Sequence, residues 1–149
     1  MPGAPGIPFA PTGVGSYGEV MGDTAVSDLP QLVDRYLDAL DGDTRRVANN
    51  QWGISIDAAG WPLHIGVALR DGLLRAQAEV LGPGRLEPEA LLRWNRGLPL
   101  VRFSHTAAGD LYVEGALPLE AVTEARLDGF LGLLVRVATQ AREAASTKR

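Results

Sequence analysis

The sequence contains no cysteine, one lysine and two histidines, and these scarcities restrict the chemistry open to it. The absence of cysteine excludes disulfide bonds, thiolate metal sites and a cysteine nucleophile. Two histidines offer little imidazole for metal binding or proton transfer. No apolar run approaches the roughly 20 residues that a membrane-spanning helix needs. The first residues also lack the basic start and apolar stretch of a secretory signal, so we expect a cytoplasmic protein without a membrane anchor.

What the chain does contain is typical of one soluble domain. Its 149 residues are 46% hydrophobic and 21% charged, which is enough to bury a substantial core. The formal net charge is −4, and the arginines are scattered among acidic residues. Because nucleic-acid-binding domains usually carry a basic stripe, this balance argues against nucleic acid as a direct partner.

Residues 1–26 read as a flexible arm. The first 22 positions hold four prolines and six glycines, with no helical or strand period. Within the arm, residues 13–18 (GVGSYG) match the dinucleotide fingerprint G-x-G-x-x-G. That fingerprint binds pyrophosphate only between a strand and a helix, and neither is indicated here. We therefore expect no bound nucleotide and no other cofactor.

The folded domain is predicted to span residues 27–149 and to begin with an amphipathic helix. Apolar residues recur at helical spacing from Leu29 to Leu40, and Ser27 is a suitable N-cap. Three strands follow. Trp52 begins an alternating pattern, a turn lies at residues 57–60, and Asp71 with Gly72 forms a strong hairpin signal before the third strand.

The second half repeats the alternation of helix and strand. Pro88 opens a short helix with Leu91, Leu92 and Asn95 on one side. Strands over residues 100–106 and 111–117 form another hairpin, and Thr123 can cap a last helix that reaches residue 145. The apolar stripe of that helix is Leu127, Phe130, Leu131, Leu134, Val137, Ala138 and Ala141. The prediction is an α+β fold in the order α-β-β-β-α-β-β-α, with a five-stranded antiparallel sheet.

These elements carry a family resemblance. Residues 91–103 (LLRWNRGLPLVRF), 109–113 (GDLYV) and 117–119 (LPL) resemble the YbjN-type domain of bacteria. In that family a helix ends in Asn before a Leu-Pro link, a strand with Arg-Phe, a Gly-containing hairpin and a second Leu-Pro. The element order is similar to that of class I type III secretion chaperones, which bind effector segments as homodimers. The resemblance implies a regulator of stress responses or sensory transduction and carries over no catalytic residue.

The residues themselves also favour binding over catalysis. His64 and His105 both fall within predicted strands, where a histidine on the solvent face or in a structural hydrogen bond is the usual case. Ser104 and His105 are neighbours on one strand and so point to opposite faces, which prevents a nucleophile and base pair. The acidic pairs at residues 41–43 and 87–89 fit helix ends. No metal site is expected.

Several apolar residues lie outside the predicted core stripes and are candidates for a protein interface. Trp94 lies beside the stripe of the short helix, Leu133 and Val135 widen the stripe of the last helix, and Gly129 and Gly132 permit close approach there. We expect a homodimer that binds an unidentified protein as a chaperone-like adaptor or stress-response regulator. The alternative is a nucleic-acid-associated factor that uses arginines of the open sheet face, with candidates Arg70, Arg75 and Arg102.

Overall fold

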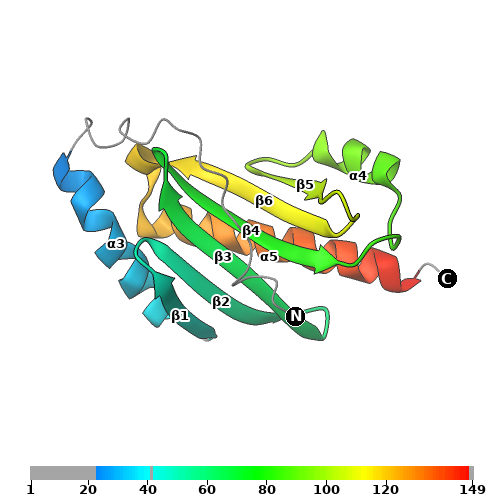
Figure 1. Cartoon of the computed structure of the whole chain (residues 1–149), viewed down its shortest axis with the longest axis horizontal. Coiled ribbons are helices and arrows are strands. Elements are labelled where there is room, and N and C mark those ends of the chain that lie inside the picture. The colour runs from blue at the N-terminus through cyan, green and yellow to red at the C-terminus, as the bar shows by residue number, and fades with distance from the viewer. Residues whose placement is uncertain (1–22, 41, 148–149) are drawn as a thin grey trace.

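The protein folds as a six-stranded antiparallel sheet flanked by helices (Figure 1). The computed structural model describes residues 23–40 and 42–147. The helices are α3 (Asp23–Asp38), α4 (Pro88–Asn95) and α5 (Glu124–Thr147), with a 3-10 turn at Leu119–Ala121. The strands are β1 (Asp43–Ala48), β2 (Gln51–Ala58), β3 (Trp61–Arg70), β4 (Leu73–Leu81), β5 (Val101–His105) and β6 (Leu111–Pro118). Their order in the sheet is β1-β2-β3-β4-β6-β5, which confirms the predicted α+β class.

Tight turns set the register of the central strands. Asp71 and Gly72 have φ values of 58° and 76° between β3 and β4, and the flanking Arg70 and Leu73 face each other. This is the left-handed pair that a two-residue hairpin needs, as the sequence predicts. Ala59 and Gly60 (φ 57° and 92°) make the equivalent turn between β2 and β3.

The core lies between one face of the sheet and α5, which crosses that face (Figure 1). All seven residues of the predicted apolar stripe on α5 are buried, and they meet the inward side chains of the strands. The Thr123 hydroxyl accepts a hydrogen bond from the Arg126 backbone N–H at 3.1 Å, so the predicted cap is present. The largest fully buried strand residues are Leu63, Ile65, Val67, Leu74, Val80 and Val113.

The start of the described chain differs from the sequence prediction in two ways. The sheet has six strands, not five, because β1 precedes the predicted set. Its sequence, DTRRVA, has no apolar alternation, and nearly every residue is exposed, so periodicity gave no signal. The first helix begins at Asp23, which places Ser27 within it and not at its N-cap. Residues 1–22, with the glycine motif at 13–18, lie outside the described residues.

A buried charge, Arg142, ties the C-terminal part of α5 to the sheet. Arg142 is only 3% exposed and donates hydrogen bonds to backbone carbonyls of Val80, Ala58, Trp61 and Pro62 at 2.9–3.1 Å. Its guanidinium also lies 3.3 Å from the centre of the Trp61 ring. Burial lowers the pKa of Arg142 to about 10, which leaves it charged at neutral pH. No helix among the described residues is both long enough and apolar enough to cross a membrane.

Candidate protein-binding surface

The exposed apolar side chains gather around α4. In the described part of the chain, five large hydrophobic residues are exposed, and Leu92, Trp94 and Leu100 belong to α4 or to its link with β5. Their exposed fractions are 65%, 40% and 56%. The other two, Val47 and Trp61, lie on β1 and at the start of β3. We define the α4 surface as Leu92, Trp94 and Leu100.

The sequence prediction for α4 needs one correction. Leu91 is buried and Asn95 half-buried, but Leu92, which was predicted to share their side, is the most exposed large hydrophobic residue on the described surface. Leu91 and Leu92 lie about 100° apart around the helix, and α4 packs mainly against β5, on the side that carries Leu91. Trp94 is partly covered, since its ring centre lies 5.9 Å from that of Phe103.

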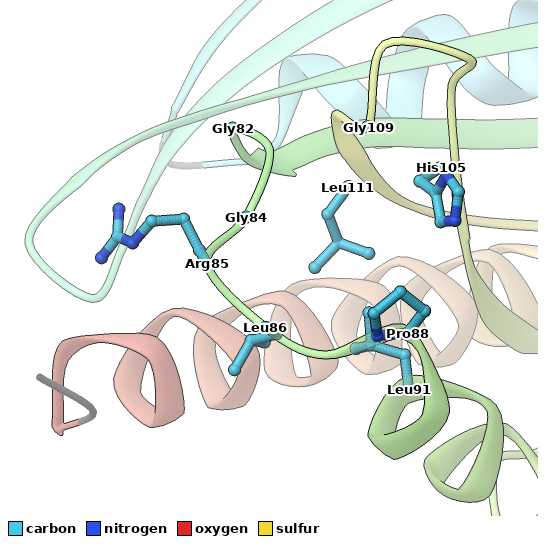
Figure 2. A pocket seen from close by; sticks show the side chains of 9 residues that line it. All are labelled: Gly82, Gly84, Arg85, Leu86, Pro88, Leu91, His105, Gly109 and Leu111. Carbon is cyan, nitrogen blue, oxygen red and sulfur yellow. The ribbon is translucent and has the colours of Figure 1, made fainter.

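An apolar hollow runs beside α4. One part, of about 170 Å³, is lined by the loop before α4 together with Leu91, His105 and Leu111. A second part, of about 220 Å³, shares those three residues and extends to Leu92 and Phe103. Leu111 points into the hollow, whereas Arg85 points away from it (Figure 2). Leu92, the most exposed residue of the α4 surface, borders the second part of the hollow.

The link from α4 to β5 is held in a strained shape. Leu100 has φ 63°, a left-handed conformation that non-glycine residues rarely adopt. Its carbonyl lies against Gly115 on β6, where an added Cβ would overlap that oxygen and come within 2.9 Å of the Phe130 ring. Glycine is thus required at position 115, and the strained backbone leaves the Leu100 side chain exposed.

The interface residues predicted on α5 lie apart from the α4 surface. Leu133 and Val135 are half-buried and pack against the core, while Gly129 and Gly132 are exposed with open space where a Cβ would stand. The main contacts of α4 are with β5, not with α5. The structure therefore separates the predicted set into two surfaces, and their role in an interface stays a prediction.

The open sheet face, opposite α5, carries polar residues of both signs. Arg102 pairs with Glu114 at 3.5 Å, and Glu79 lies opposite Tyr112. Burial, and secondarily the nearby Asp110 carboxylate, raise the pKa of Glu79. Burial, followed by the charges of Glu79 and Asp110, raises the pKa of Tyr112. The carboxylates of Glu79, Asp110 and Glu114 therefore offset the positive charge of the arginines that the nucleic-acid alternative requires.

Sequence reasoning missed one serine–histidine pair. Ser55 and His64 face each other across β2 and β3, with Ser55 Oγ and His64 Nδ1 separated by 2.7 Å. The signal was available in principle, since a hairpin turn at residues 59 and 60 fixes this register. Neither residue lines either part of the hollow. His105 borders the hollow, and its Nδ1 lies 3.0 Å from the Thr106 carbonyl. In residues 23–40 and 42–147, no three acidic or histidine side chains form a group that could hold a metal ion.

The α+β fold is similar to that of type III secretion chaperones. One similar solved structure is a chain of the HopA1–SchA chaperone–effector complex, with a TM-score of 0.62, 13% sequence identity, and coverage of 83% of this chain and 98% of that one. Another is the Yersinia pestis type III secretion chaperone SycH in complex with a stable fragment of YscM2, with a TM-score of 0.52, 16% identity, and coverage of 78% and 98%.

The chain belongs to the YbjN family, which confirms the resemblance noted in the sequence. The family model, described as "Putative bacterial sensory transduction regulator", matches residues 66–146. The match therefore includes α4, β5, β6 and most of α5, together with the link that carries Leu100. A comparison with curated proteins finds no match.

Proposed function

We propose that the protein is a non-enzymatic protein-binding module, a chaperone-like adaptor or regulator of a bacterial stress or sensory response, that acts in the cytoplasm as a homodimer. The observation that carries the proposal is the concentration of exposed apolar side chains on the α4 surface beside a hollow. Exposed apolar area favours burial against a partner by about 25 cal/mol per Å², before the cost of association is subtracted. Family membership and the fold of effector-bound chaperones support the same function.

The charges of α4 support a second copy of the chain as the first partner. Glu87 and Glu89 stand at the N-terminal end of the helix, and Arg93 and Arg96 at its C-terminal end. When two such helices pack antiparallel about a two-fold axis, the acidic end of each faces the basic end of the other.

The oligomeric state of the purified protein tests this proposal. We expect sedimentation velocity to show a dimer, and Trp94→Ala to weaken it by about 1,000-fold in Kd, since the dimer loses two tryptophans and each central tryptophan contributes about 2 kcal/mol. Leu92→Ala should act in the same direction. Val47→Ala removes a comparably exposed apolar side chain from β1 and should leave the dimer unchanged. A monomeric wild type at the highest soluble concentration would refute the homodimer.

Charge reversal distinguishes antiparallel packing of α4 from a generic hydrophobic contact. Glu89→Arg and Arg93→Glu should each weaken the dimer, because each creates like-charge pairs across the two-fold axis. The double variant recreates opposite pairs and should recover most of the lost affinity. If the double variant is weaker than both single variants, the helices do not pair in this way.

The open sheet face gives little support to nucleic-acid binding. Arg102 is already paired with Glu114, and Glu79 adds negative charge to the same face. A titration with a labelled oligonucleotide at low salt separates the two functions, because phosphate contacts weaken steeply as salt rises. Salt-dependent binding that is lost in Arg75→Ala would favour the nucleic-acid function over the one proposed.

A further inference from the structure

The sheet ends at β5, and the outer edge of this strand is covered by a side chain of α4. The Asn95 amide donates a hydrogen bond to the Phe103 carbonyl at 3.1 Å, and its oxygen accepts one from the Phe103 N–H at 2.7 Å. A neighbouring antiparallel strand forms the same pair of hydrogen bonds with a single residue. Asn95 therefore occupies the place of a seventh strand at the centre of β5.

The helix that carries Asn95, α4, makes few buried contacts with the rest of the domain. Leu91 is the one residue of α4 that is buried, and the hollow leaves space on its flank. A helix of eight residues is too short to persist without tertiary contacts. Elements with few buried contacts open at a lower free energy than the core of the domain.

Both connections of α4 contain residues that permit movement. Gly82 and Gly84 precede the helix, and Gly84 has φ 78°. Gly97 follows it, and beyond Gly97 comes Leu100 in its strained left-handed conformation. Release of the helix would let Leu100 relax, which offsets part of the cost of breaking the contacts of Leu91 and Asn95.

We propose that α4 is a releasable cover on β5, and that its release opens this edge to an extended segment of a partner protein. The exposed groups would be the backbone N–H and carbonyl of Phe103, which an extended segment satisfies as an added strand. The space vacated by Leu91, above Leu111, accepts an apolar side chain of that segment. The proposal rests on the protein-binding function, but the movement of α4 is testable without any partner.

Native-state hydrogen exchange followed by NMR tests whether α4 leaves β5 while the rest of the domain stays folded. The Phe103 amide should exchange through an opening that does not expose the Ala78 amide on the central strand β4. The Phe103 amide should exchange at least tenfold faster than the Ala78 amide, each relative to its rate in an unstructured peptide, and its exchange should depend less on added urea because the opening of α4 exposes less surface. If both amides exchange with one common free energy and one common urea dependence, α4 leaves only when the whole domain unfolds, and the proposal fails.

A glycine-to-alanine variant that leaves the Asn95 hydrogen bonds in place tests the two connections of α4. Gly82 and Gly97 have ordinary backbone angles, and an added Cβ would meet nothing closer than 3.8 Å at either position. Alanine there restricts the open state by about two- to fivefold at each position, so the Gly82→Ala, Gly97→Ala double variant should slow Phe103 exchange by about four- to thirtyfold. Unchanged or faster exchange would overturn the hinge role of these glycines.

A peptide tests whether the uncovered edge accepts a strand. The probe is a fluorescein-labelled peptide with the sequence of Leu111–Pro118, the strand that β5 already pairs with on its other side. Fluorescence anisotropy should show at least tenfold tighter binding to Asn95→Ala than to the wild type. In a control peptide, proline replaces Val113. Proline has no backbone N–H to donate to the edge of β5, so this peptide should bind more weakly. Equal affinity for both proteins, or for both peptides, would exclude strand addition at β5 whether or not the dimer of the proposed function exists.

Discussion

Replacement of Arg142 by methionine is the sharpest test of how the helical layer is attached to the sheet. The substitution keeps an unbranched apolar stem and removes a guanidinium that bonds four backbone carbonyls. Trp61 and Pro62 are exposed, so water can reach their carbonyls once the guanidinium is gone. Val80 and Ala58 are buried, and their carbonyls would lose a partner that water cannot replace.

The expected loss follows from those two carbonyls. Each buried polar group left without a partner costs about 1–3 kcal/mol. Part of this is returned, because the guanidinium pays a desolvation penalty in the folded state, as its lowered pKa shows. We expect Arg142→Met to lower the free energy of unfolding by about 2–4 kcal/mol, a large share of the 5–15 kcal/mol typical of a domain. Arg142→Lys should fall between this variant and the wild type, because one ammonium cannot span all four carbonyls.

Urea denaturation followed by circular dichroism measures this loss as a lower midpoint with an unchanged slope. Arg136→Met is the matched control, because Arg136 lies on the same helix and is exposed. It should change the free energy of unfolding by less than about 0.5 kcal/mol. An Arg142→Met protein as stable as the wild type would refute the reasoning, since burial of the charge would then cost as much as its hydrogen bonds contribute.

Three further outcomes test other parts of the structure. Gly115→Ala should destabilise the fold by about 2–3 kcal/mol through overpacking. Gly132→Ala places its methyl group in open space on a helix and should stabilise the fold by about 0.5–1 kcal/mol. Urea midpoints measure both changes, and dissociation of the oligomer by Gly132→Ala would show a partner at that face. Burial, and secondarily a hydrogen bond to Asp128, raise the pKa of Tyr36 above the ordinary value of 10.0. The unfolded chain therefore loses this proton first, and the free energy of unfolding should fall as the pH rises beyond 10.0. Tyr36→Phe should flatten this part of the pH profile, and an unchanged profile would assign it to another group. Deletion of residues 1–22, which show no apolar period, should shift Tm by no more than about 4 °C; a larger shift in a thermal melt would make the arm part of the folded assembly.

Local periodicity was sufficient for most of the fold. β4, which alternates between a buried and a more exposed face, and the stripe of α5 from Leu127 to Ala141 follow the sequence prediction. β3 departs from simple alternation, because Gly66 and Ala68 on its other face are buried as well. Turn chemistry placed the hairpin at Asp71 and Gly72. β1 was missed for a physical reason: an exposed edge strand buries neither face, so selection leaves no alternating pattern in it.

The features that carry the candidate site could not be predicted in the same way. Leu92 and Leu91 are both leucines next to each other, and only the position of β5 decides that one is buried and the other exposed. The left-handed backbone of Leu100 has no local signature, because the residue is neither glycine nor asparagine. Both depend on how the link between α4 and β5 is folded against Gly115, which periodicity does not encode.

Two polar side chains show most clearly where local patterns end. Arg142 is a charged residue on a helix, a position that ordinarily faces water, yet it is buried because the carbonyls it bonds come from residues 62 to 84 positions earlier in the chain. Asn95 reads as a helix terminus, yet its amide completes the hydrogen bonds of a strand. In both cases the side chain acts on backbone groups, which every residue carries, so the sequence of the partner gives no sign of the contact. The difference lies in burial: Arg142 is sealed under Trp61 and fixes α5, whereas Asn95 stands on a short helix at the border of a hollow. The same type of contact is therefore permanent in one place and, in our proposal, releasable in the other.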